Sequence, residues 1–322
     1  MPEELKVLLD DDFSSGLTAD RWSHAAIGPL MMDDGVVTTA ADGLRVVAKG
    51  VNDVTGEPAF TSTLPREEEN GYGLTGALDH LKWLAYAKHD PERGLPGFDA
   101  EPGWVLTFES WLSGCTYGTA LHPFGDTVSA DDHRLAAIII TTVDPATGLV
   151  FNFLLTNDTV YAQYERLDIQ RSRLGEYAAF NYLVPVARRT PADKHHLAIS
   201  FDRSGGVVRW LVNGTEVFRI DRPGTKLPER THLTEDHGGT ETVVESERLN
   251  CGMGLVTRLD GAAPGQSALV RLSSAEAYYF ATDEGAPKPQ EFFDDKSLPA
   301  NRLFGQGAEL TLTRYRVTSS RR

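Results

Sequence analysis

Most of the chain after residue 100 alternates apolar and polar residues with a period of two, and this pattern restricts the fold more than any other feature. In WVLTFESWL (104–112), Leu106 and Phe108 share one face, whereas Glu109 and Trp111 share the other. Successive side chains of a β-strand point to opposite faces, so the alternation predicts strands with one buried side. We therefore expect an all-β protein.

Turn sequences separate the strand-like runs. Asn157-Asp158 and Asn213-Gly214 are typical of tight hairpin turns. Pro185 suggests a sheet edge or the end of a strand, because proline cannot donate to a strand ladder. The predicted strands cover residues 43–49, 104–112, 134–142, 149–156, 159–167, 179–186, 196–202, 207–221, 251–259, 268–273, 276–281 and 308–317.

One segment breaks the pattern. In residues 74–89, Leu74, Leu78, Leu81 and Ala85 recur at helical spacing, and Pro91 follows. This spacing predicts one short helix on the β body, either packed at its flank or capping a binding face. Because no internal repeat and no long linker divides the chain, we expect a single domain over residues 1–322, with long loops.

Charge and cysteine content restrict the compartment and the partners. The chain has 31 lysine and arginine residues against 46 aspartate and glutamate residues, so its net charge is −15, which disfavours nucleic acid. No apolar run matches a secretory leader or the ~20 residues of a membrane span. We expect a cytoplasmic protein in which Cys115 and Cys251 stay reduced. The oligomeric state stays open.

Several motifs carry a family resemblance. DDFSSGLTADRW (11–22), GLRVVAK (43–49), WVLTFESWLSG (104–114) and HHLAISFDRSGGVVRWLVNGTEVFRID (195–221) resemble the concanavalin A-like lectin/glucanase superfamily. Together with DHGGTE, CGMG and GQGAEL, the chain is similar to an uncharacterised family within it. The resemblance implies a jelly-roll β-sandwich whose concave face holds ligands. It is also compatible with a structural calcium at residues 10–12 or 131–132.

The catalytic motif of the glucanase members is missing. Those proteins carry acids in an E-x-D-x-x-E pattern on one strand, but FESWLSG holds only Glu109. A second acid, Glu165, lies in TVYAQYERL on the same face as Tyr161 and Gln163. If this face and the face of Glu109 are both concave, the two acids converge there as general acid and base. Trp111, Tyr161 and Gln163 would then contact the substrate.

The stretch TEDHGGTE (234–241) supports two interpretations. Gly238-Gly239 and the carboxylate of Asp236 suit a tight turn. Alternatively, Asp236 orients His237, which then transfers protons at the rim of the sandwich. His122, in LHPFGD, is a second candidate of this kind and would contact the substrate.

The sequence contains nothing that requires a cofactor. None of the nine histidines has metal-ligand spacing, so we expect no transition metal. The first functional hypothesis is a cofactor-independent acid/base enzyme, of the lyase, isomerase or cyclase type, with a small organic substrate in the concave face. The alternatives are a glycoside hydrolase or glycan lyase, and a non-catalytic lectin-like protein that binds carbohydrate.

Overall fold

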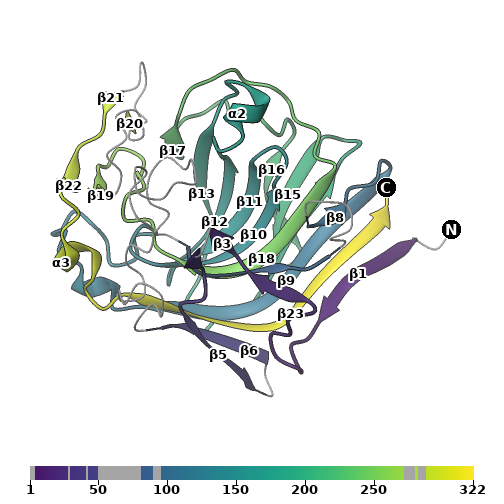
Figure 1. Cartoon of the computed structure of the whole chain (residues 1–322), viewed down its shortest axis with the longest axis horizontal. Coiled ribbons are helices and arrows are strands. Elements are labelled where there is room, and N and C mark those ends of the chain that lie inside the picture. Colours follow the sequence, from purple (N-terminus) through teal and green to yellow (C-terminus); the bar gives the residue numbers. More distant parts are fainter. Residues whose placement is uncertain are drawn as a thin grey trace.

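The computed structural model of the chain describes residues 4–27, 30–40, 43–49, 81–89, 96–271, 280–281 and 288–322. Two antiparallel sheets, which we call sheet A and sheet B, are stacked face to face in this part of the chain (Figure 1). The all-β class that the alternation predicts is confirmed, and the sandwich is the fold that the family resemblance implies.

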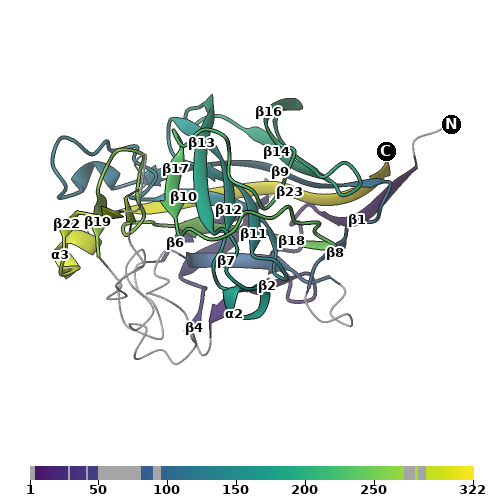
Figure 2. The ribbon, with the colours of Figure 1, turned by 90° about the horizontal axis from the view of Figure 1, so that it is seen from above.

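In the described part of the chain, sheet A has eight strands. Their order is β16 (Thr215–Ile220), β15 (Val207–Val212), β14 (His195–Asp202), β9 (Trp104–Tyr117), β23 (Gly307–Arg321), β6 (Gly43–Ala48) and β5 (Gly35–Ala40), and β1 (Leu5–Asp11) also pairs with β23. The long strands β9 and β23 lie side by side across the molecule (Figure 2). Their ladder forms the middle of the sheet.

Sheet B has nine strands among the residues that the structure describes. Their order is β17 (Leu233–Asp236), β13 (Phe180–Arg188), β12 (Thr159–Arg166), β11 (Leu149–Leu155), β10 (Ala137–Asp144), β18 (Arg248–Val256), β7 (Leu81–Ala87) and β2 (Trp22–His24), and β8 (Phe98–Asp99) also pairs with β18. Pro185 of β13 lies beyond the stretch of β13 that pairs with β17, which ends at Tyr182. Among the described residues, the strand that pairs with β13 at Pro185 is β12, through Tyr161.

The remaining elements are short. They are the strand pairs β3 (Ala26–Ile27) with β4 (Leu30–Met31), β19 (Ala268–Val270) with β22 (Phe292–Asp294), and β20 (Phe280–Ala281) with β21 (Lys288–Pro289), and the helical turns η2 (Thr119–Leu121), α2 (Arg171–Leu174) and α3 (Pro299–Arg302). In the described ranges, no helix is long and apolar enough to cross a lipid bilayer.

The core fills the space between the sheets. Sheet A contributes Leu106 and Phe108 of β9, and sheet B contributes Phe151 and Phe153 of β11. Burial of such apolar surface is the main favourable term in folding. The partition of 104–112 into a core face and an outer face is therefore confirmed, and Glu109 lies on the outer face of sheet A.

Trp210 of β15 joins the two sheets beneath the centre of sheet B. Its ring is fully buried, and its Nε1 donates a hydrogen bond of 2.8 Å to the backbone oxygen of Asn152 in β11. The ring of Phe151 packs edge-on against it, with 5.8 Å between the centroids. A side chain of sheet A thus holds a strand of sheet B directly.

The predicted helix over 74–89 is wrong where it can be compared. Residues 74–80 lie outside the described ranges, but Leu81–Ala87 form strand β7, paired with β18 and β2. Trp83 and Ala85 face the core, whereas Leu84 and Tyr86 face outward. LKWLAYA is apolar on both faces, so it fits a period of 3.6 as well as a period of two. Pairing with two neighbouring strands decides between them.

Candidate functional site

A cavity of about 210 Å³ lies on the outer face of sheet B, away from the core. Two rows of side chains cross the strands beneath it. The first row consists of Tyr86, Gly252, Thr141, Asn152 and Gln163, which stand directly opposite one another on β7, β18, β10, β11 and β12. The second row consists of Val150, Glu165, Asn181 and Glu235 on β11, β12, β13 and β17. Polar groups from six strands therefore meet in one place.

Two glycines of β18 keep the floor of the cavity low. A Cβ atom on Gly252 would lie 2.4 Å from the oxygen of Ala85, and one on Gly254 would lie 2.5 Å from the oxygen of Trp83. Both distances are far below van der Waals contact, so β7 can pair this closely only with glycine at these positions. This close approach explains the CGMG motif.

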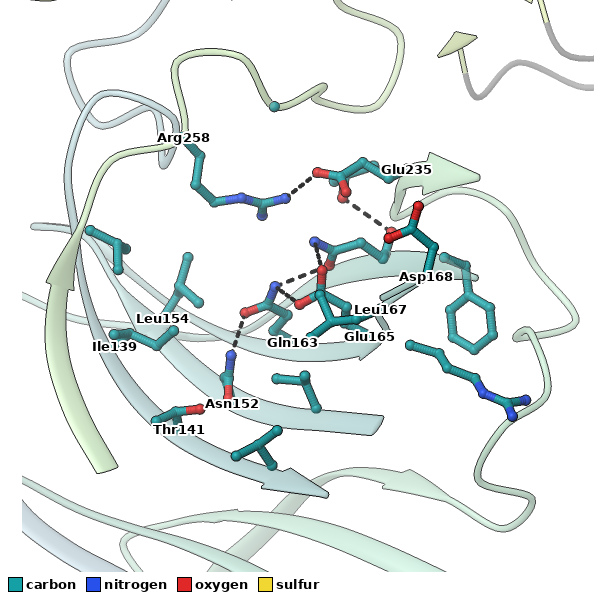
Figure 3. A pocket seen from close by; sticks show the side chains of 18 of the residues that line it. Ile139, Thr141, Asn152, Leu154, Gln163, Glu165, Leu167, Asp168, Glu235 and Arg258 are labelled. Atoms are coloured by element: carbon teal, nitrogen blue, oxygen red, sulfur yellow. Dashed lines mark hydrogen bonds and ion pairs between the residues drawn. The ribbon is translucent and has the colours of Figure 1, made fainter. Parts of the chain in front are cut away.

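Three amide side chains form a connected network in the cavity wall, and Figure 3 labels two of them, Asn152 and Gln163. Asn152 donates to Gln163 Oε1 at 2.8 Å, and Gln163 donates to Asn181 Oδ1 at 3.2 Å. These amides are buried, with 3%, 4% and 1% of their surface exposed in that order. Buried polar groups need partners, and here the amides satisfy one another.

The network ends at the carboxyl group of Glu165. Gln163 Nε2 donates to its Oε2 at 3.1 Å, and Asn181 Nδ2 donates to its Oε1 at 3.3 Å. Burial raises the pKa of Glu165 to about 8, and the negative charge of Glu235 acts in the same direction. Burial and the charge of Glu235 disfavour the ionised form, so Glu165 carries a proton at neutral pH, and two neutral amides fix its orientation.

Glu235 has the opposite environment. Arg258, which follows β18, donates to its Oε1 at 2.6 Å, and Nε2 of His237 lies 3.8 Å from its Oε2. Burial opposes the charged imidazole, but the carboxylate of Glu235 outweighs it and raises the pKa of His237. The guanidinium of Arg258 favours the ionised form of Glu235. One wall of the cavity thus holds a neutral carboxyl group and a carboxylate.

The pH dependence of the stability should show whether Glu165 is protonated in the folded protein. The pKa of this group is about 8 when folded and about 4.3 when unfolded, so the folded state alone binds the proton between these values. The free energy of unfolding of the wild type therefore falls as pH rises through this window. The free energy of unfolding of Glu165→Gln, taken relative to that of the wild type, should rise by on the order of 1 kcal/mol between pH 5 and pH 8.5. This figure includes a reduction for screening by solvent in the cavity.

Urea denaturation of both proteins at the two pH values measures this difference. His237 is present in both proteins, so the difference between them reports the change at position 165. Glu165 would not be neutral in the folded state if the difference in free energy of unfolding between the two proteins stayed constant with pH. The same conclusion would follow if the variant lost stability relative to the wild type as pH rises.

The structure separates the two acids that the sequence analysis placed together. Glu109 lies on the outer face of sheet A, on the opposite side of the sandwich from Glu165. It is paired with His196 at 3.0 Å and with Arg316 at 2.7 Å, and the ring of Trp111 stacks on His196. The expected convergence is therefore wrong. Alternation fixes the faces within one strand, but it does not show which sheet face carries a cavity.

The expected pairing of Asp236 with His237 is also wrong. Asp236 points to the core side of β17, where it accepts hydrogen bonds from Lys226 at 2.6 Å, Arg230 at 2.9 Å and the N–H of Gly238 at 3.0 Å. The turn interpretation of DHGG is confirmed by the last contact. His237 itself lines the cavity, and its neighbouring carboxylate is Glu235.

Of the other predicted residues, Gln163 and Tyr161 belong to the cavity or its wall, whereas His122 does not. Gln163 lies within the cavity, and Tyr161 packs in the apolar cluster that continues its wall. His122 stacks on Phe124, 5.9 Å between ring centroids, away from the cavity. Its Nδ1 accepts the N–H of Phe124.

The carboxylates considered for calcium have protein partners. Asp10 is paired with Arg314, and Asp11 accepts the indole N–H of Trp22. Asp132 is paired with Arg134, and Asp131 accepts the N–H of Asn157. Within the described ranges, no group of three or more His, Cys, Asp or Glu residues is arranged to hold a metal ion.

Sequence reasoning missed Tyr86, Asn152, Asn181, Glu235 and Arg258. Two of them gave a signal, because LVFNFLL and FNYLV each hold one asparagine in an otherwise apolar strand. A buried amide in such a strand needs a partner, and partners on neighbouring strands indicate a polar network. Burial also raises the pKa of Tyr86 to about 12, against a hydrogen bond with Thr141, so its phenol stays protonated.

The sequence matches a family model over residues 10–321, which is nearly the whole chain. The model describes a family of unknown function, DUF6081. The chain belongs to this family. This DUF6081 protein is also 26% identical to an uncharacterized protein of Acanthamoeba polyphaga mimivirus, across 92% of this chain and 84% of the viral protein.

Solved structures of carbohydrate-acting enzymes are similar to this DUF6081 protein along most of its length. An alginate lyase of polysaccharide lyase family 7 has 11% identity and a TM-score of 0.44, over 89% of this chain and 84% of the lyase. An endo-1,3-beta-glucanase from Streptomyces sioyaensis has 10% identity and a TM-score of 0.43, over 98% of this chain and 96% of the glucanase. A Crh5 transglycosylase has 13% identity and a TM-score of 0.38, over 98% and 87%.

Proposed function

We propose that this DUF6081 protein is an acid/base enzyme that cleaves a glycosidic bond of a saccharide bound in the cavity on sheet B. The observation that carries the proposal is the contrast between Glu165 and Glu235. One is clamped by neutral amides and keeps its proton, whereas the other is held by Arg258 and His237 as an anion. Two carboxyl groups whose environments separate their protonation states form an acid/base pair.

The spacing of the two acids suits this role. Asn181 lies between them in the same row, so their Cα atoms are two strand spacings apart, about 10 Å. In glycosidases that use an activated water, the carboxyl groups themselves are about 6.5–9.5 Å apart, a separation that two glutamate side chains on Cα atoms at this distance can reach. Glu165 would donate its proton to the departing glycosidic oxygen. Glu235 would accept a proton from the attacking water or from the sugar itself, and His237 would exchange it with solvent.

The lining of the cavity suits a hydroxyl-rich ligand. Carboxylate and amide oxygens accept hydrogen bonds from hydroxyl groups, and Nη1 of Arg258 is a buried donor without a hydrogen-bond partner among the described residues. Ile139, Leu154 and Val256 provide an apolar wall for the C–H face of a ring. Side chains of this mixture orient a ligand through a few polar contacts while apolar surface supplies affinity.

A second function is favoured by the volume of the cavity. At about 210 Å³ it is smaller than the pockets that hold drug-sized ligands, about 300–1,000 Å³. A single small hydroxylated molecule would fill it. The same acid and base could then act without a cofactor as a lyase, isomerase or cyclase on such a substrate.

A panel of neutral, amino and uronic oligosaccharides, together with monosaccharides, tests both functions. We expect at least one oligosaccharide to be cleaved. Mass spectrometry distinguishes hydrolysis, which adds water to the products, from β-elimination, which leaves an unsaturated sugar. Conversion of a monosaccharide alone would support the second function instead. Saturable binding of an intact sugar without any product would refute both enzymatic functions and favour a lectin-like protein.

A further inference from the structure

A backbone N–H group sets the orientation of the amide groups in the network beside Glu165. The N–H of Thr142, which can only donate, lies 3.3 Å from Oδ1 of Asn152. This contact fixes the oxygen of Asn152 toward β10 and leaves its NH₂ group toward Gln163. An amide side chain has one accepting and one donating end, so each orientation in a chain of amides determines the next.

The orientation passes along the network to the acid. Because Gln163 receives its hydrogen bond at Oε1, its NH₂ group faces both Asn181 Oδ1 and Glu165. Asn181 then has only its own NH₂ group to present to Glu165. Both oxygens of the Glu165 carboxyl group therefore meet donors, although neither amide is charged.

We propose that Asn152 is a positioning residue that makes both amides present N–H groups to Glu165, so that its acidic proton is directed into the cavity. An oxygen that accepts an amide N–H cannot use the same position for its own proton. The proton of the neutral carboxyl group must occupy a remaining position, outside the network. Asn152 acts through Gln163 and does not contact Glu165. The catalytic value of this arrangement rests on the proposed function, but the orientation itself does not.

The variant Asn152→Asp reverses the chain. The new carboxylate still accepts the N–H of Thr142 but has no N–H for Gln163. Gln163 should then rotate to donate to it, and Asn181 should rotate in turn, so that Glu165 faces amide oxygens. The proton on Glu165 would be drawn into the network.

Added charge must be separated from orientation. The charged groups that act most strongly on Glu165 are Glu235 and His237 from β17 and its end, Asp168 from the segment after β12, and Arg258 from the segment after β18. A further negative charge raises the pKa of Glu165 in any orientation. Val150→Asp is the matched control, because Val150 stands directly opposite Glu165 and contributes no amide to the network. Asn152→Leu, which adds no charge, is a second variant.

Nuclear magnetic resonance of the side-chain NH₂ groups and the Glu165 carboxyl carbon measures the orientation during a pH titration. In the wild type and in Val150→Asp, the NH₂ signals of Gln163 and Asn181 should shift with the same midpoint as Glu165. In Asn152→Asp they should no longer follow that midpoint. In Asn152→Leu, which removes the fixed end of the chain, Gln163 should give two sets of signals. NH₂ signals that follow Glu165 equally in all four proteins would overturn the proposal.

Activity provides a separate readout once a substrate is known. Asn152→Asp should lower kcat by about 10–100-fold with KM changed less than about threefold, as expected for a group that orients another. Reorientation without any turnover in the wild type would refute the proposed function and leave the positioning role standing. An unchanged kcat together with reorientation would refute the catalytic consequence alone.

Discussion

Replacing Glu165 with glutamine is expected to lower turnover by a factor of about 10²–10⁴. Glutamine has nearly the same size and can remain hydrogen bonded to Gln163 or Asn181, so the cavity should keep its shape. It cannot transfer a proton to a leaving oxygen. The loss should therefore appear in kcat, whereas the affinity for the intact substrate should change little. Steady-state kinetics and calorimetric binding measure the two effects.

Glu109→Gln is the matched control for this result. The chemical change is identical, but Glu109 lies on the outer face of sheet A and pairs there with His196 and Arg316. Turnover of this variant should stay within about twofold of the wild type. The assignment of the acid would be wrong if Glu165→Gln kept more than a tenth of the activity, or if both variants lost activity to the same extent.

The largest effect on stability should come from Trp210→Ala, which we expect to lower the free energy of unfolding by about 3–5 kcal/mol. The substitution removes a fully buried ring that contacts Phe151 and Phe218, and it also removes the hydrogen bond to the oxygen of Asn152. A cavity would remain between the sheets, because β-strands paired on both sides cannot move inward to fill it.

Urea denaturation measures this loss, and Trp104→Ala is its control. Trp104 is half-buried at the start of β9, with the ammonium group of Lys6 3.9 Å from its ring centroid. Its replacement should cost less than about 1 kcal/mol. Similar losses for the two tryptophans would show that Trp210 does not hold the sheets together.

The side-chain faces of the strands could be predicted from the sequence because alternation is a local property. The placement of Tyr161, Gln163 and Glu165 on one face of β12 is confirmed by the core contacts of Val160, Ala162 and Tyr164. The relation between strands of different sheets is not local. Nothing in the residues around Glu109 indicates that its face looks away from the face of Glu165.

The TEDH stretch shows a second reason why the site could not be predicted fully from the sequence. The pattern drew attention to Asp236 and His237 in a loop, but Thr234 to Asp236 belong to the short strand β17. Alternation in a strand turns Asp236 toward Lys226 and leaves Glu235 facing the cavity. Pairing with β13 decides this, and a four-residue strand carries too little pattern to be recognised.

The position of Cys115 has a practical consequence. It is half-buried on the same face of β9 as Glu109 and Trp111, and it is a free thiol, whereas the other cysteine, Cys251, is completely buried. A thiol-directed dye should therefore modify the native protein at a single position, slowly because burial raises the pKa of the Cys115 thiol. Since the attached group would lie across the sandwich from the cavity on sheet B, fluorescence could follow the protein without obstructing ligand entry.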